Sequence, residues 1–260
     1  MSKHLPRGGI WWLISMVLAV YLSAAVAFAQ ETNPQTIGIL YFENNSVVDK
    51  DKLDPLKKGL TEMLITEMSK IKSLKVVDRQ RIQSAVEELN LDETDVVDKE
   101  TSQKVGKLLD VKVLLIGGFS NLFGDKFRID AHIVSTETGQ TLKEEEETGD
   151  LDQFLTMIKS FVKKISDDLD VKLSAVEEDQ LESTKDGKFD GYVTYAQGLN
   201  LEDSGDKLEK EGKSGAAAVD YDNARSMFQK AWDESNGYEP AKRKMEEMTA
   251  LTEKMKKEIK

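Results

Sequence analysis

The side chains that most often carry enzyme chemistry are scarce in this chain of 260 residues. It contains no cysteine, which excludes a thiol nucleophile, and it has two histidines. Only His132 lies beyond the first 29 residues, in an alternating segment that predicts a solvent-facing side chain. A zinc site needs several His or Cys ligands, and a Ser-His-Asp triad would have to use His132 without a nucleophile motif beside it. These residues predict a protein that is not an enzyme.

Phosphate and metal motifs are also missing where an α/β protein would carry them. The first apolar run, residues 37–42, leads into ENNSVVDKDKLDP, which has neither glycine-rich phosphate signature. Asn44 and Asn45 can cap and turn the backbone by themselves, so we interpret this loop as a structural turn. The acidic run Glu144–Glu147 lacks the spacing of a calcium loop, and a strand would point alternate carboxylates to opposite faces. We therefore expect no cofactor and no metal ion.

The first 29 residues are predicted to be a cleaved export signal. Lys3 and Arg7 precede a long uncharged apolar stretch, and the small residues of Ala27–Ala29 place the cut before Gln30. The alternative is an uncleaved membrane anchor, because about 20 apolar residues can span a bilayer. The remainder is exported in both cases, so we expect a periplasmic protein, and association with the outer membrane stays open.

The charge balance restricts the partners. The formal net charge is -12, and loss of the basic signal would make it more negative. An acidic surface argues against nucleic acid and against anionic lipid as main partners. Membrane association is therefore expected only indirectly or through an uncleaved signal. An exported chain without cysteine has no disulfides and no lipid-modified N-terminal cysteine, so packing must supply its stability.

Residues 36–172 are predicted to form one α/β unit, a mixed β-sheet flanked by helices. Strands are predicted over residues 36–42, 74–79, 111–122, 126–134 and 142–148, the third of them central and the last a charged edge strand. Helical spacing of apolar residues predicts helices that begin at Asp54-Pro55 and lie around residues 82–89, 105–109 and 154–169. Asp150 and Gln153 resemble a capping box for the last helix, whose apolar stripe we expect to close the core of this unit without help from the tail.

The remaining chain is predicted to be a linker followed by an all-helical module. The linker covers residues 173–188, which are polar and poor in aromatic residues, and part of it can be helical. Residues 189–260 show helical patterns throughout, apart from a charged, glycine-containing insert at residues 202–215 between the first two helices. The tail is therefore expected to be a small all-α region of three helices.

Several short motifs of the α/β unit occur in the order in which the curli-assembly (CsgG-like) family carries them. They fall on Tyr41-Phe42 with Asn44-Asn45, Val76–Arg79, Gly106-Lys107, Leu114–Gly118 and Thr138-Gly139. Residues 36–170 thus resemble this family, which is similar to the N-terminal domain of TolB-type proteins and to lipoprotein activators of penicillin-binding proteins. The resemblance implies a non-enzymatic role in envelope secretion, surface-organelle assembly or enzyme activation.

Two departures from the secretion-pore members favour an adaptor over a channel. Those members carry a lipidated cysteine, which is absent here. They also insert membrane-spanning hairpins, whereas residues 119–147 pass directly between predicted strands without a spare pair of alternating segments. We therefore predict a periplasmic adaptor in envelope assembly or secretion. The alternative is an outer-membrane-associated secretion channel subunit of the curli-assembly type.

The helical tail resembles a tetratricopeptide (TPR) hairpin. The repeat's small and large packing positions match Gly198, Leu199, Ala224, Phe228 and Ala231. Asn236 stands where the repeat normally has proline, and an ordinary three-helix appendage is the alternative. A single repeat cannot bury its apolar face alone, so it must pack on the α/β unit, on the helix from Pro240, or on another subunit.

The helical module is the predicted place of partner binding. The candidate residues are Tyr192, Tyr195, Asn200, Asn223 and Lys230, because tyrosine rings offer contact area and the other three offer hydrogen bonds. The alternative is that both tyrosines pack between the helices. The expected partners are envelope proteins, and a homo-oligomer stays open. The sequence does not name the partner.

Overall fold

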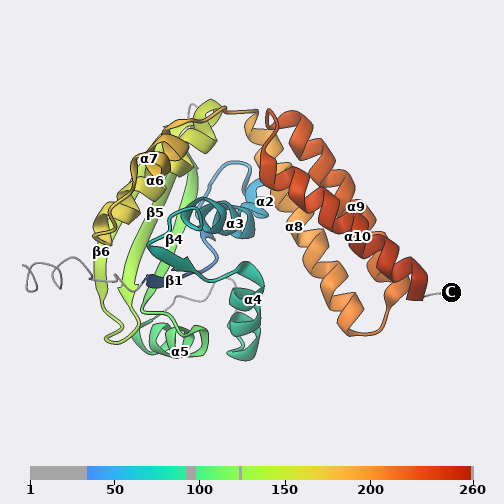
Figure 1. Cartoon of the computed structure of the whole chain (residues 1–260), viewed down its shortest axis with the longest axis horizontal. Helices are drawn as coiled ribbons and strands as arrows, with labels where there is room; N and C mark the ends of the chain where they lie inside the picture. Colours follow the sequence, from blue (N-terminus) through green and yellow to red (C-terminus); the bar gives the residue numbers. More distant parts are fainter. Residues whose placement is uncertain (1–33, 92–97, 123–124, 259–260) are drawn as a thin grey trace, which may run out of the picture. The chain divides into compact units, whose positions relative to one another are not determined.

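The computed structural model describes residues 34–91, 98–122 and 125–258, and six of the described strands form one mixed sheet (Figure 1). The strands are β1 (Gln35–Ile39), β2 (Glu43–Asn44), β3 (Leu74–Val76), β4 (Val113–Leu122), β5 (Lys126–Ser135) and β6 (Thr141–Asp150). Their order is β3-β1-β4-β5-β6, and β2 pairs with β4 beyond the end of β1. β1 is parallel to β3 and β4, whereas β4, β5 and β6 are antiparallel. The predicted mixed sheet, with a central apolar strand and a charged edge strand, is confirmed.

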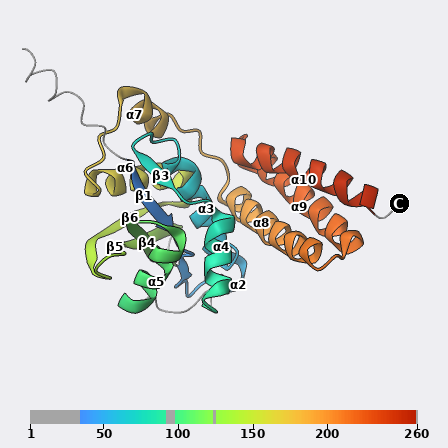
Figure 2. The ribbon, with the colours of Figure 1, turned by 60° about the horizontal axis from the view of Figure 1, so that its bottom comes forward.

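Helices cover both faces of the sheet, and each face has its own hydrophobic core (Figure 2). The larger core joins Ile39 to Met63 and Ile158 from the helices on one face. The smaller core contains Ile82 and Val105 from the helices on the other face. These helices, with a short one that precedes them, are α2 (Lys50–Leu53), α3 (Leu56–Met68), α4 (Arg79–Glu88), α5 (Lys99–Leu109) and α6 (Phe154–Asp168). The α/β part of the predicted fold class is thereby confirmed.

The segment after the first strand is held by asparagine hydrogen bonds, and Asn44 itself belongs to the short strand β2 and not to a turn. The Asn44 side-chain amide donates to the carbonyl of Lys50 at 2.9 Å, and the Ser46 amide donates to the side-chain oxygen of Asn44 at 3.1 Å. The Asn45 amide donates to the carbonyl of Phe119 at 2.8 Å. Asn44 is buried, so its side chain replaces the backbone partners that this loop would otherwise lack.

The start of α6 differs from its prediction. A short 3₁₀ turn, η1 (Leu151–Gln153), precedes the helix, and neither Asp150 nor Gln153 makes a side-chain cap. Asp186 caps this helix instead, because its carboxylate accepts hydrogen bonds from the amides of Leu155 at 2.8 Å and Thr156 at 3.0 Å. The predicted capping box is therefore wrong, since the cap comes from a segment distant in sequence.

A smaller difference concerns α3. The helix begins at Leu56 with Pro55 as its N-cap, one residue later than predicted, and Asp54 provides no side-chain cap. The short helix α2 directly precedes this point, so the chain enters α3 from another helical turn instead of from a loop.

The tail is helical, and its first helix is longer than predicted. The helices are α7 (Ala175–Glu182), within the segment predicted as a linker, and α8 (Phe189–Lys210), α9 (Ser214–Glu234) and α10 (Glu239–Glu258). α8 continues through the predicted insert and leaves residues 211–213 as the turn to α9. Within that insert Glu202 is buried and Gly205 lies against the ring of Tyr221. The polar insert is therefore helix, because its charges meet partners inside the fold.

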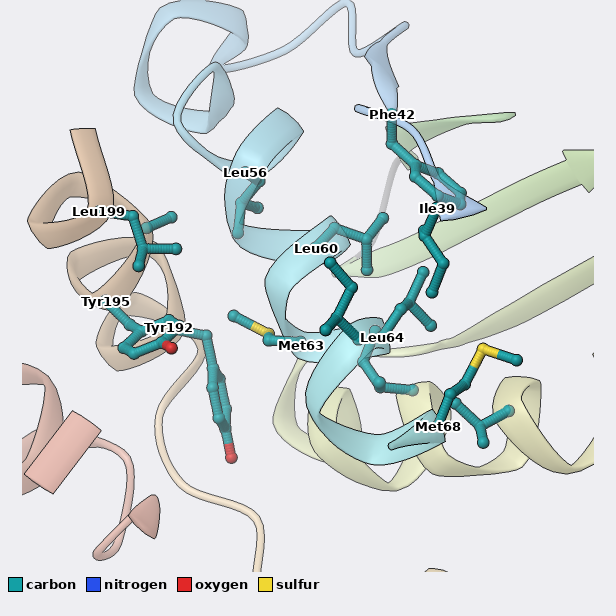
Figure 3. Close-up of a cluster of buried hydrophobic side chains, with 14 of the residues drawn as sticks. Ile39, Phe42, Leu56, Leu60, Met63, Leu64, Met68, Tyr192, Tyr195 and Leu199 are labelled. Carbon is teal, nitrogen blue, oxygen red and sulfur yellow. The ribbon is translucent and has the colours of Figure 1, made fainter. Parts of the chain in front are cut away.

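The two parts of the fold share one core. Residues Pro34–Lys260 form a single compact unit, and the larger core runs continuously from the sheet through α3 into α8, α9 and α10. Figure 3 shows Leu56 and Met63 of α3 together with Tyr192 and Tyr195 of α8 in this core. The α8–α9 hairpin is thus covered by α3 on one side and by α10 on the other.

A candidate partner-binding groove between α4 and α8

An open groove of about 850 Å³ lies where α4 of the α/β part faces α8 of the helical part. Its lining is polar throughout and consists of Lys58, Gln80, Gln83, Ser84, Glu87, Asn200, Asp203, Ser204, Asp206, Lys207 and Lys210. Each wall is one helical face, because the α4 residues and most of the α8 residues recur at spacings of three and four. The groove therefore presents two rows of amide, hydroxyl and charged side chains toward one space.

The α4 wall is fixed by local capping and by a tyrosine. Asp78 begins α4 as its N-cap, and its carboxylate accepts a hydrogen bond from the Arg81 amide at 2.9 Å. The Tyr41 hydroxyl donates to the side-chain oxygen of Gln83 at 2.6 Å, and this hydrogen bond fixes the orientation of the Gln83 amide. Lys58 of α3 lies 5.6 Å from the centre of the Tyr41 ring. These contacts hold the polar face of α4 toward the groove.

A buried ionic network joins the two walls. Arg79 is 3 % exposed, and its guanidinium pairs with Asp203 of α8 and lies 3.4 Å from a carboxylate oxygen of Glu202. The same guanidinium lies 3.5 Å from Glu62 of α3, and Lys244 of α10 binds Glu202 at 2.7 Å. Four helices are thus connected through one arginine and its neighbours.

The three carboxylates around Arg79 keep its guanidinium charged in spite of its burial. Burial alone would lower the pKa of Arg79, but the carboxylates of Asp203, Glu202 and Glu62 raise it above its ordinary value. Burial raises the pKa of Glu62 and of Glu202, although the nearby cations oppose this change. The arginine therefore stays charged, and the relative position of α4 and α8 is tied to its ion pairs.

The five residues predicted from sequence do not come together. Both Tyr192 and Tyr195 are fully buried, in the positions that the packing alternative describes. Asn200 is exposed and lines the groove. Asn223 lines a separate shallow depression on α9, and Lys230 lies 3.9 Å from Glu234 on the same helix. In this structure the tyrosines offer no surface area to a partner, and partner binding by the other residues stays a prediction.

Sequence reasoning missed Arg79 and the groove around it. The motif Val76–Arg79 was visible, but an arginine at the start of a helix is usually a solvated residue. The available signal was the position of Arg79 at the start of α4, with two residues between it and the end of β3 at Val76. No property of residues 202–203 in the sequence shows that they bind it.

The groove can recognise a polar surface, and its residues are not arranged as a nucleophile, a base and an orienting acid. No group of three or more His, Cys, Asp or Glu side chains suited to a metal ion occurs among the described residues. His132 lies outside the groove on the open face of β5, 3.5 Å from Glu144. Within the described ranges no helix is both long enough and apolar enough to cross a membrane, and the predicted export signal lies outside them.

Three solved structures are similar over about half of this chain. The C-terminal domain of LpoB from Salmonella enterica has 13% identity and a TM-score of 0.35, and covers 50% of this chain and 92% of its own. Lipoprotein GNA1162 from Neisseria meningitidis has 14% identity and a TM-score of 0.34, with coverage of 52% and 99%. The PelC dodecamer from Paraburkholderia phytofirmans has 6% identity and a TM-score of 0.36, with coverage of 55% and 92%.

A family model provides the direct sequence match. No curated protein matches this chain. The model described as the curli production assembly/transport component CsgG matches residues 15–125, which include the motifs at Tyr41-Phe42, Val76–Arg79 and Leu114–Gly118. Over these residues the chain is similar to the CsgG family, in line with the resemblance of its motifs.

Proposed function

We propose that this protein is a non-enzymatic, exported accessory protein of the cell envelope that acts as an adaptor in assembly or secretion. The family match supports the envelope role, because that family is described by assembly and transport. The predicted signal before Gln30 supports export to the periplasm. The TPR-like α8–α9 hairpin would serve as one wall of the binding site.

The observation that carries this proposal is the groove between α4 and α8. Its volume of about 850 Å³ is within the range of binding clefts, and its two walls come from the two parts of the fold. The amides of Gln80 and Asn200 can each donate and accept hydrogen bonds, which suits the backbone of an extended segment of a partner. The Gln83 amide is already held by Tyr41 and Glu87. Because Arg79 joins the walls, the groove is preformed and binding would require little ordering of the protein.

Affinity capture with blocking variants tests this proposal. The full chain is used as bait against an envelope extract, with Ser84→Arg on one wall and Asn200→Arg on the other. Asn223→Arg is the matched control, because Asn223 is an equally exposed asparagine on α9. We expect one protein to be captured by the unmodified chain and by the control, and to be lost with both groove variants.

Two results would count against the groove adaptor. A captured protein that survives both groove variants but is lost with Asn223→Arg would move the binding site to α9. A ring-shaped assembly of this chain that is released from membranes only by detergent would favour the secretion channel subunit.

A further inference from the structure

An exposed apolar patch lies at the end of the sheet, away from the α4–α8 groove. It consists of Val47, Val48 and Leu122, whose exposed fractions are 89 %, 43 % and 40 %. The amide of Asn121 donates to the Ser46 hydroxyl at 2.9 Å. Val47 directly follows Ser46 and Leu122 directly follows Asn121, so this hydrogen bond joins the two segments that carry these apolar residues. Contiguous exposed apolar residues of this kind are characteristic of interaction sites.

A cavity of about 800 Å³ adjoins the patch, and its wall begins at Asp49, the next residue after Val48. Its lining consists of Asp49, Lys52, Leu53, Asn121, Asp125, Asp150, Leu151, Asp152, Gly187, Lys188, Phe189 and Asp190. Lys52 pairs with Asp190 at 2.8 Å, and Asp150 pairs with Lys126. The lining carries five aspartates against two lysines, Lys52 and Lys188, and Asp49 also interacts electrostatically with Lys52. Within the described residues neither Asp125 nor Asp152 makes an ion pair. The space beside the patch is therefore negatively charged.

We propose that this patch and cavity form a second docking surface, which takes a basic segment of a protein partner. An apolar side chain of that segment would cover Val47, Val48 and Leu122, and its Lys or Arg residues would enter the cavity toward the unpaired aspartates. Opposite charge also speeds encounter, so a basic segment is favoured kinetically as well. This inference goes beyond the groove and does not depend on it, because the two surfaces share no residue.

The negative charge of the cavity favours a basic protein segment over a membrane or a second copy of this chain. A bilayer with anionic lipids would be repelled by the aspartates of the adjoining cavity. A second copy of this chain has a net charge of -12 and would be repelled over most of its surface. A basic segment is attracted by the same field, and its apolar side chain is accommodated by the patch. An adaptor with this second surface would hold two partners at once.

Fluorescence anisotropy tests the proposal with the full chain and a defined probe. The probe is a fluorescein-labelled peptide of alternating leucine and lysine, and the control peptide has glutamate in place of lysine. The variants are Val47→Ser with Val48→Ser, and Asp125→Asn with Asp152→Asn. Asn tolerates the left-handed backbone of Asp125, whose φ is 58°. The matched control is Val219→Ser on α9, because Val219 is another exposed valine.

At physiological salt we expect the lysine peptide to bind the unmodified chain and the Val219→Ser chain equally. The valine pair and the aspartate pair should each weaken binding about tenfold or more, with melting temperatures unchanged. The proposal is overturned if the lysine peptide does not bind, or if it binds both pairs of variants as well as the unmodified chain. Binding to phosphatidylglycerol vesicles that the valine variants abolish would assign the patch to a membrane. Self-association that they abolish would assign it to a second copy.

Discussion

Gly59 of α3 lies so close to Ala196 of α8 that a Cβ added to Gly59 would be 2.4 Å from the Cβ of Ala196. This approach brings the apolar face of α3, with Leu56 and Met63, into the same core as Tyr192 of α8 (Figure 3). The helical region is therefore joined to the α/β region through direct helix packing as well as through ion pairs.

The first prediction concerns this close approach. Glycine inside a helix is normally about 0.5–1 kcal/mol less stable than alanine, so Gly59→Ala would usually raise the melting temperature. Here we expect it to lower the melting temperature, because the new methyl group meets Ala196. The double variant Gly59→Ala with Ala196→Gly should be more stable than the sum of the single changes predicts. Additive effects in this double-mutant cycle would contradict the direct contact.

The second prediction concerns the fragment of residues 30–175. The apolar stripe of residues 154–169 predicted a core that closes without the tail, but the structure shows that Leu56 and Met63 also pack in the core that contains α8. Removal of α8 would expose these side chains, so we expect the fragment to melt at a much lower temperature than the full chain or without a cooperative transition. An unchanged, cooperative transition in calorimetry would show that the α/β region is independent.

The third prediction concerns the cap of α6. Asp186 accepts hydrogen bonds from the Leu155 and Thr156 amides, and loss of such a cap costs about 0.5–2 kcal/mol. We expect Asp186→Ala to lower the free energy of unfolding by this amount in urea titration. Gln153→Ala is the control, because Gln153 makes no side-chain cap. If Asp186→Ala and Gln153→Ala lower stability equally, Asp186 does not act as the cap of α6.

The fourth prediction separates packing from binding at Tyr195. The ring is fully buried, and its hydroxyl has no hydrogen-bond partner in the described part of the chain. We expect Tyr195→Ala to cost about 3–5 kcal/mol of stability, while Tyr195→Phe is neutral or stabilising because it removes an unpaired polar group. Thermal melts of both variants provide the measurement. A stable Tyr195→Ala chain that loses a captured partner would restore the binding role.

The fifth prediction concerns Arg79 and pH. Arg79→Met leaves Glu62, Glu202 and Asp203 without their shared cation, and we expect a loss of about 3–5 kcal/mol at neutral pH. Burial raises the pKa of Glu62 and Glu202, so the folded chain binds protons more readily than the unfolded chain. The stability that these two groups contribute is then largest below their ordinary pKa of about 4.3 and is lost as pH rises through the raised values.

Urea unfolding at pH 7 and pH 5 checks this prediction. The difference in stability between Arg79→Met and the unmodified chain should shrink at the lower pH, because the carboxyl groups that lost their cation take up protons. Arg225→Met is the control, since Arg225 is partly exposed and its one ion pair within the described residues is with its neighbour Asp222 on α9. A difference that does not change with pH would contradict the role of buried carboxylates.

Local patterns in the sequence determined much of the α/β region. In β5 the residues Phe127, Ile129 and Ala131 are buried, and Arg128 and Asp130 are partly exposed, as the alternation predicted. The motifs at Val76–Arg79 and Leu114–Gly118 likewise indicated the resemblance to the CsgG family, whose model matches residues 15–125. These features can be predicted from the sequence because the period of apolar residues indicates which side of a strand or helix faces the core.

The tertiary structure alone decided the contacts that define both proposed surfaces. Arg79 pairs with Asp203, which lies 124 positions further along the chain, Asp186 caps α6, and the Ser46 hydroxyl accepts a hydrogen bond from the Asn121 amide. The polar residues 202–215 looked like a loop because charge predicts solvent, yet Glu202 is buried against Arg79 and Lys244. The polarity of a side chain determines which kind of partner it requires when it is buried. Which residue becomes that partner depends on how whole helices and strands pack together.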